Sequence, residues 1–200
     1  MQCADELIGL GPLATPRRPS APDPLMTFGA LSRLWHEPTV IETEVLFRLA
    51  DAAQDAGDHE LARQSFERGA ALGDTASLTR LALIYDVGVG VAPDRVRAMS
   101  LYQRAWRLGR DAVAANNIAI LYKEGGRRRE MFRWFQRSAG TGDGSAHLSM
   151  AKCYLDGSGV RSNPQSALRC LAVAAGSFYI SGDEREEAQA LLKTLAPNVV

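Results

Sequence analysis

Two short glycine pairs have the residue types and the spacing that could bind phosphate. Gly88 and Gly90 flank a valine, and Gly157 and Gly159 flank a serine. A phosphate-binding loop of this kind follows a strand, opens a helix and is accompanied by a lysine or a downstream acidic residue. Neither pair follows a predicted strand, and neither has that lysine. The pattern therefore favours a structural role for both pairs over a nucleotide site.

The histidines are the next candidates, because imidazole is a common general base and metal ligand. They lie far apart in the sequence, and none has the His-x-x-x-His or Cys/His spacing of zinc ligands. We therefore expect exposed side chains for His36, His59 and His147. No Ser/His/Asp or Cys/His arrangement can be argued for either. The sequence predicts that the protein is not an enzyme and has no cofactor or metal site.

The densest basic segment of the chain is a run of three arginines. Arg127, Arg128 and Arg129 are consecutive, and Arg133 and Arg137 follow at helical spacing. Guanidinium groups with a tryptophan nearby could bind phosphate or an acidic partner. The alternative, which we favour, is a solvated helix face balanced by the adjacent glutamate.

The composition of the 200-residue chain is that of a soluble globular protein, with 46% hydrophobic and 23% charged residues. Basic and acidic residues number 23 each, so no overall field favours nucleic acid or an anionic membrane. No apolar run approaches the roughly 20 residues of a transmembrane helix. The amino terminus lacks the basic region of a signal peptide. We expect a cytoplasmic protein that binds no nucleic acid and has no membrane span.

A repeat rich in alanine, leucine and arginine extends over most of the chain. Residues 76–109 align without a gap over residues 145–178, so that a tyrosine and the two glycine pairs coincide. A middle unit at residues 113–142 fits between them, with Tyr122 at the same position and a shorter loop. A degenerate unit at residues 45–73 precedes them. Strand signals are absent, so this region is predicted to be all-α.

The repeat pattern Leu-Ala/Gly-x-x-Tyr-x-x-Gly-x-Gly-Val-x-x-Asp closely resembles the Sel-1-like repeat family, a relative of the tetratricopeptide repeat. The resemblance covers roughly residues 42–195. It implies an all-α fold, a right-handed α-α solenoid of about four helix pairs with a C-terminal capping helix. In this family the glycines form the extended turn between the two helices of a pair, where we expect positive φ.

The domain organisation follows from this repeat and from the composition around it. Residues 1–24 are rich in proline and are predicted to be flexible. Residues 25–40 have the apolar spacing of a short amphipathic helix followed by a linker. The repeat domain is expected at residues 41–195, with a tail at residues 196–200. We place its units at about residues 42–73, 74–109, 110–142 and 143–178, and the capping helix at residues 181–195.

Four kinds of residue are expected to position these helices. Small residues let paired helices approach closely at Ala82, Ala119 and Ala151. Aromatic rings are expected to fill the gaps between neighbouring pairs at Tyr85, Tyr122 and Tyr154. Helices are expected to be capped at their N-termini by Asp58, Asp94 and Asn163, and by a capping box of Ser181 and Glu184. Free cysteines are expected at the apolar positions Cys153 and Cys170, although a bond between the two remains an alternative.

The resemblance also implies a function. We expect a non-enzymatic protein–protein interaction module, a bacterial adaptor or regulatory scaffold that holds a peptide or protein in its concave groove. An inhibitory or immunity-type protein that blocks a partner enzyme or toxin is the alternative. Counting from the tyrosines, the inward positions predicted to contact the partner are Thr79, Arg80, Asp86, Asn116, Asn117, Lys123 and Lys152. The sequence indicates neither the identity of the partner nor the oligomeric state.

Overall fold

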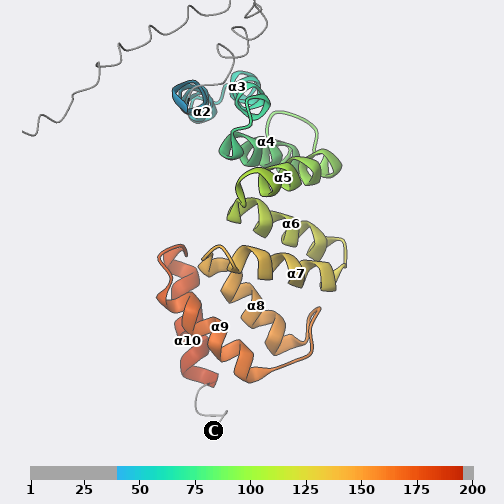
Figure 1. The fold of residues 1–200 in the computed structure, drawn as a ribbon, viewed down its shortest axis with the longest axis vertical. Helices are drawn as coiled ribbons and strands as arrows, with labels where there is room; N and C mark the ends of the chain where they lie inside the picture. Colours follow the sequence, from blue (N-terminus) through green and yellow to red (C-terminus); the bar gives the residue numbers. More distant parts are fainter. Residues whose placement is uncertain (1–39, 196–200) are drawn as a thin grey trace, which may run out of the picture. The chain divides into compact units, whose positions relative to one another are not determined.

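The computed structural model describes residues 40–195 of the chain, and all of them belong to one compact unit, Pro38–Val200 (Figure 1). The predictions made for residues 1–24, for the amphipathic segment before residue 40 and for the tail at residues 196–200 lie outside the described residues. Between residues 40 and 195 the secondary structure is helical, without a strand.

The described helices form consecutive pairs. They are α2 (Val40–Asp55), α3 (His59–Ala71), α4 (Thr75–Val87), α5 (Arg95–Gly109), α6 (Ala112–Glu124), α7 (Arg128–Ala139), α8 (Gly144–Asp156), α9 (Pro164–Gly176) and α10 (Gly182–Leu195). Each of α2, α4, α6 and α8 packs against the helix that follows it, and α10 packs on α9 and α8. Figure 1 shows successive pairs stacked one on the next. The fold is therefore the all-α solenoid that the sequence predicted, with four helix pairs and a terminal helix.

The predicted caps explain where several helices begin. The carboxylates of Asp58 and Asp94 accept hydrogen bonds from the third backbone N–H after them, at 3.0 and 2.9 Å. The Asn163 side chain accepts from Ser166 N at 3.0 Å. Each bond satisfies an N–H group that the helix itself leaves without a partner. In the capping box, Ser181 N donates to Glu184 and Glu184 N donates back to the Ser181 hydroxyl, both at 3.3 Å. The predicted caps are confirmed.

The two glycine pairs lie in the α4–α5 and α8–α9 loops, and all four glycines have positive φ, between 68° and 83°. The second glycine of each pair also touches the preceding helix pair. A Cβ at Gly90 would lie 2.5 Å from the Cβ of His59, and one at Gly159 would overlap the carbonyl oxygen of Arg128. His59 and Arg128 are the first residues of α3 and α7. Each glycine pair therefore joins neighbouring repeats, which gives it a structural role in the solenoid.

The core confirms the predicted alanines but not all of the predicted tyrosines. Ala82, Ala119 and Ala151 are fully buried. Tyr85 is also buried, and two valines of its glycine loop pack on the core beside it. Tyr122 is only half-buried, because the shorter α6–α7 loop has no such valines and the Arg127 side chain covers the ring instead, 4.7 Å from its centroid.

Tyr154 is also half-buried, with its ring edge-on to Phe132 at 5.2 Å. The largest fully buried aromatic side chains are Phe66 and Tyr102, which lie on the second helices α3 and α5. The aromatic packing between repeats therefore depends on second helices more than the sequence pattern indicated.

The cysteines agree with expectation, whereas one of the described histidines does not. Cys153 and Cys170 are both free, so the alternative of a bond between them is wrong. His59 is exposed as predicted, whereas His36 lies outside the described residues. His147 is half-buried, and burial lowers its pKa, opposed by the Asp143 carboxylate. The prediction of a solvated surface position for His147 is therefore wrong.

Candidate functional site

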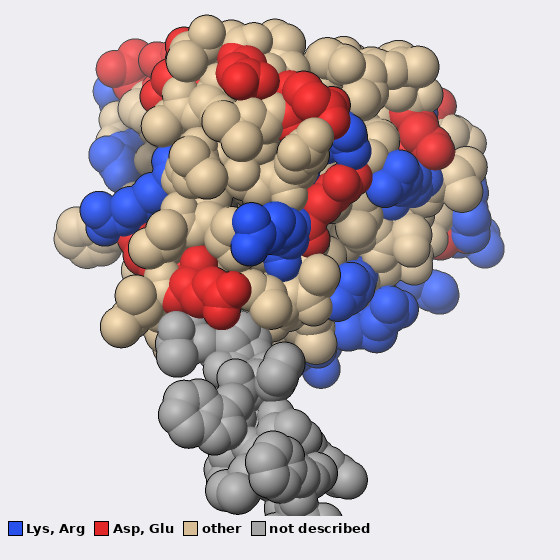
Figure 2. All heavy atoms as spheres, turned by 90° about the horizontal axis from the view of Figure 1, so that it is seen from above, with Lys and Arg blue, Asp and Glu red and all other residues tan. Residues whose placement is uncertain are grey.

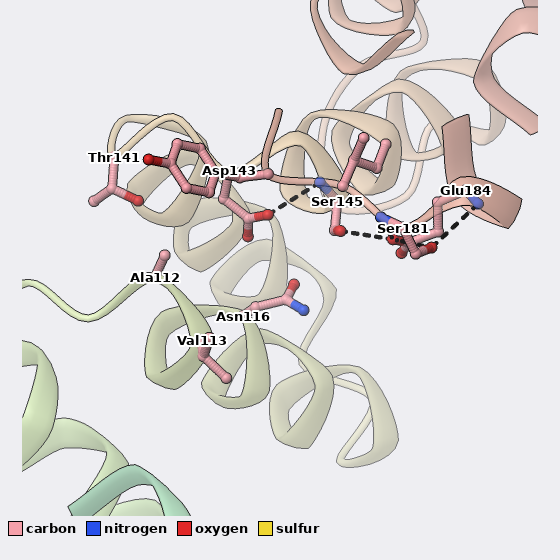
Figure 3. Close-up of a pocket in the computed structure, with 10 residues that line it drawn as sticks. Ala112, Val113, Asn116, Thr141, Asp143, Ser145, Ser181 and Glu184 are labelled. Carbon is pink, nitrogen blue, oxygen red and sulfur yellow. Dashed lines mark hydrogen bonds between the residues drawn. The ribbon is translucent and has the colours of Figure 1, made fainter. Parts of the chain in front are cut away.

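Two pockets lie along α6 and α8, the first helices of the last two pairs. The pocket of about 570 Å³ is at the N-terminal ends of these helices, where the α9–α10 loop closes one side (Figure 3). We call it the N-terminal pocket. Its lining residues are Ala112, Val113, Asn116, Thr141, Asp143, Ser145, Tyr179, Ile180, Ser181 and Glu184.

Most of the polar groups in the N-terminal pocket are held by hydrogen bonds to other residues of the chain. The Ser145 hydroxyl on α8 donates to the Glu184 carboxylate on α10 at 2.7 Å, and Ser145 N donates to Asp143 at 3.0 Å. Asn116 is different, because its buried Oδ1 atom has no hydrogen-bond partner. Figure 3 shows the Asn116 amide directed into the space between α6 and the Ser145–Glu184 pair. An unsatisfied buried carbonyl is costly, and a donor from a bound partner would satisfy it.

The charge of Glu184 depends on these contacts. Burial alone would raise its pKa, but hydrogen bonds from Ser145 and Ser181 outweigh burial, so the pKa of Glu184 is lowered. Glu184 therefore stays ionised at neutral pH, and the N-terminal pocket contains two carboxylates, Asp143 and Glu184.

Glu184→Gln is expected to lower the free energy of unfolding by about 1–2 kcal/mol at pH 7, because an amide accepts weaker hydrogen bonds than a carboxylate. The folded pKa lies below the unfolded one, so this stabilisation is complete at neutral pH and is lost as the pH falls through the folded pKa. The difference between the two proteins should shrink below the usual glutamate value of about 4.3. Urea unfolding at neutral and acidic pH measures it, with the exposed neighbour changed by Glu186→Gln as control. An equal difference at both pH values would contradict this role.

The second pocket, of about 420 Å³, lies at the C-terminal ends of α6 and α8. We call it the C-terminal pocket. Its lining residues are Lys123, Arg128, Met131, Phe135, Ser149, Lys152, Cys153, Asp156 and Ser158. Lys152 forms an ion pair with Glu187 on α10 at 2.7 Å. Lys123 and Arg128 have no ion-pair partner within the described part of the chain, so this pocket has a net positive charge although the Asp156 carboxylate also lines it.

Cys153 does not make the C-terminal pocket a nucleophilic site. Burial raises the pKa of its thiol to about 11, although the nearby Lys123 charge opposes this. A thiol with such a pKa is protonated at neutral pH, and the thiolate is the reactive form. Within residues 40–195, no group of three or more His, Cys, Asp or Glu side chains could hold a metal ion.

The predicted groove residues on α6 and α8 fall into both pockets. Asn116 lines the N-terminal pocket, whereas Lys123 and Lys152 line the C-terminal pocket. Asn117 is half-buried and lines neither. The structure thus brings Lys123 and Lys152 together in one pocket. Asn116 lies in the other pocket, at the opposite end of the surface between α6 and α8.

The predicted groove residues on α4 lie away from these pockets. Thr79 is only 7% exposed and does not fit the expectation, because it offers a partner almost no surface. Arg80 forms an ion pair with Asp51 on α2 at 2.6 Å. Asp86 is half-buried, and burial, followed by the Glu124 charge, raises its pKa.

The predicted basic patch is divided between different surroundings. Arg127 lies over the Tyr122 ring and pairs with Glu130 at 2.8 Å. Arg128 lines the C-terminal pocket. The sequence did not predict this position, because the pocket combines residues from three helices. The remaining members, Arg129, Arg133 and Arg137, are exposed along α7. Figure 2 shows both signs of charge interspersed over the face in view, with basic side chains gathered along its lower right edge.

The two helix pairs with glycine-pair loops are also the segments that a comparison with known families identifies. The model of the Sel1 repeat matches residues 75–109 and 144–176, which are the two helix pairs with glycine-pair loops. The chain carries Sel1 repeats. Sel1 repeat proteins are generally protein-interaction scaffolds and typically not enzymes. No curated protein matches this chain significantly. None of the helices in residues 40–195 is long and apolar enough to cross a membrane.

Solved structures share the Sel1-repeat fold. One is c5321, a protective antigen present in uropathogenic Escherichia coli strains, with 25% identity over 76% of this chain and a TM-score of 0.65. Another is a Sel1 repeat protein from Oxalobacter formigenes, with 20% identity over 76% of this chain and the same TM-score. The chain covers only 33% of the first protein and 61% of the second.

Proposed function

We propose that these Sel1 repeats bind a peptide or protein partner along the surface between α6 and α8, and that the protein acts as an adaptor or regulatory scaffold. The observation that supports this proposal is the presence of pockets with polar lining residues at both ends of the same two helices. Asn116 and Lys123 are two helical turns apart on α6, about 10 Å along the axis. An extended peptide covers that distance with about three residues.

The opposite charges of the two pockets define the chemistry of the partner. The N-terminal pocket offers the Asp143 and Glu184 carboxylates and the unsatisfied Asn116 oxygen, which all accept hydrogen bonds. The C-terminal pocket offers the unpaired cations of Lys123 and Arg128. The partner segment should therefore present a donor to the first pocket and a carboxylate, about three residues away, to the second.

Both pockets are preformed by helices, so binding needs little ordering of the solenoid. Asn116 and Lys123 should contribute most, because one has an unsatisfied acceptor and the other an unpaired charge. Each loss of a charge-assisted bond is expected to weaken binding about tenfold or more.

Affinity capture with the full chain, followed by measurement of Kd for the captured partner, tests the proposal. Lys123→Ala and Asn116→Ala should each weaken binding, whereas Lys193→Ala, an exposed position on α10 outside both pockets, should not. Circular dichroism would establish that each variant is folded. Unchanged Kd values for both pocket variants would exclude this surface. A captured enzyme whose activity falls on mixing would favour the inhibitory alternative over an adaptor.

A further inference from the structure

Charge is unevenly distributed along this chain although its net charge is zero. The segment from Arg95 to Arg137 contains eleven basic and only three acidic residues. Because the net charge of the whole chain is zero, the rest of the chain has an equal excess of acidic residues. Most of these basic residues lie on α5 and α7, the second helices of two consecutive repeats. The excess therefore belongs to one part of the solenoid.

Six of these arginines are exposed and have no ion-pair partner among residues 40–195. We call them the arginine face: Arg104 and Arg107 on α5, Arg110 at the C-cap of α5, and Arg129, Arg133 and Arg137 on α7. Two other arginines of the segment are neutralised by carboxylates on neighbouring helices. Arg95 pairs with Glu124 at 2.8 Å and Arg97 with Glu67 at 3.4 Å. The unpaired charge is thus concentrated on the arginine face.

Two tryptophans join the α5 and α7 parts of the arginine face. Trp106 on α5 and Trp134 on α7 meet edge to face, with ring centroids 5.8 Å apart. The guanidinium of Arg110 lies 5.1 Å from the Trp106 ring, and that of Arg137 lies 4.3 Å from the Trp134 ring. This series of contacts places Arg110 and Arg137, which come from two consecutive repeats, on one surface.

The ring contacts also prepare the arginines for binding. A guanidinium stacked on an aromatic face keeps its N–H donors in its own plane, where they remain available to a planar anion. Its side chain is already restrained, so less rotamer freedom is lost when an anion binds. Arg110 and Arg137 are therefore suited to bidentate contacts with carboxylate or phosphate.

The geometry favours carboxylates over nucleic acid. Trp106 is only 9% exposed, and Arg137 covers a face of Trp134, so these rings offer little platform for stacking of bases. Arg133 and Arg137 are one turn apart, about 6 Å along α7, which equals the rise between acidic residues four apart on a partner helix. We propose that the arginine face is a docking surface for an acidic helical segment of a partner protein.

This docking surface is separate from the surface between α6 and α8, because no residue of the arginine face lines either pocket. It can therefore be tested with a defined probe, a fluorescein-labelled helical peptide with glutamate at every fourth position. The matched peptide has glutamine at those positions. Single- and double-stranded oligonucleotides of equal net charge complete the comparison. Fluorescence anisotropy at low and physiological salt measures each Kd for the full chain.

The wild-type protein should bind the glutamate peptide and not the glutamine peptide. The double variant Arg133→Gln/Arg137→Gln should weaken this binding at least about tenfold. The control double variant Arg161→Gln/Arg169→Gln removes two exposed arginines elsewhere and should change the Kd little. A lysine pair at positions 133 and 137 keeps the charge and should bind with intermediate affinity. The proposal would be overturned by any of three results: equal binding of both peptides, no binding of the glutamate peptide, or an equal loss of affinity in the two double glutamine variants. Tighter binding of an oligonucleotide would assign the surface to nucleic acid instead.

Discussion

Gly159→Ala is expected to lower the free energy of unfolding by about 2–5 kcal/mol. An L-residue at φ +76° costs about 1–2 kcal/mol, and the new methyl group would overlap the Arg128 carbonyl oxygen. That oxygen belongs to the backbone at the start of α7, so it cannot move aside as a flexible side chain would. The α8–α9 loop, the α7 N-terminus or both must shift, which separates two repeats.

Gly157→Ala is the matched control for this effect. Gly157 also has positive φ, at +68°, but a Cβ there meets only ordinary contacts, the nearest at 3.7 Å. We expect a cost of about 1–2 kcal/mol from the backbone conformation alone. Urea unfolding followed by circular dichroism compares the two variants. Equal stabilities for Gly157→Ala and Gly159→Ala would mean that the contact with Arg128 contributes nothing.

The contrast between these glycines separates what the sequence could predict from what it could not. Positive φ follows from the local pattern, because a turn that leaves a helix so sharply favours glycine. The same is true of the caps at Asp94 and Asn163, whose partners are three residues away. The contact of Gly159 with Arg128 depends on how one repeat is placed against the next. No local pattern contains that information.

The candidate site shows the same limit more strongly. Counting from the repeat tyrosines identified the side of α6 that bears Asn116 and Lys123, both of which line pockets. It could not show that Thr79, at a comparable position on α4, is buried, because neighbouring helices decide how much of each helix is covered. Nor could it place Glu184 beside Ser145, a contact between residues 39 positions apart.

Tyr102→Ala should be among the most destabilising substitutions in the core, at about 3–5 kcal/mol. Tyr102 is fully buried on α5, in a cluster that includes residues from α2 to α6. Tyr122→Ala removes the same atoms from a half-buried position, where the ring lies beneath a flexible arginine. We expect a loss of only about 1–2 kcal/mol there, since the half-buried Tyr122 ring buries less apolar area than Tyr102 does. The space that it leaves is also open to solvent.

Tyr102→Phe distinguishes the ring from its hydroxyl group. Burial, followed by the Asp86 carboxylate, raises the pKa of Tyr102, yet the buried hydroxyl has no hydrogen bond of acceptable geometry. Removing an unsatisfied hydroxyl while keeping the ring should therefore change stability by less than about 1 kcal/mol. Urea unfolding of the three variants gives the order directly. If Tyr122→Ala were as damaging as Tyr102→Ala, the first-helix tyrosine would be the main aromatic contact between these repeats, as the repeat pattern alone suggests. A larger loss for Tyr102→Ala would assign that contact to the second helix. The burial of a ring, rather than its place in the repeat motif, would then determine how much it stabilises the fold.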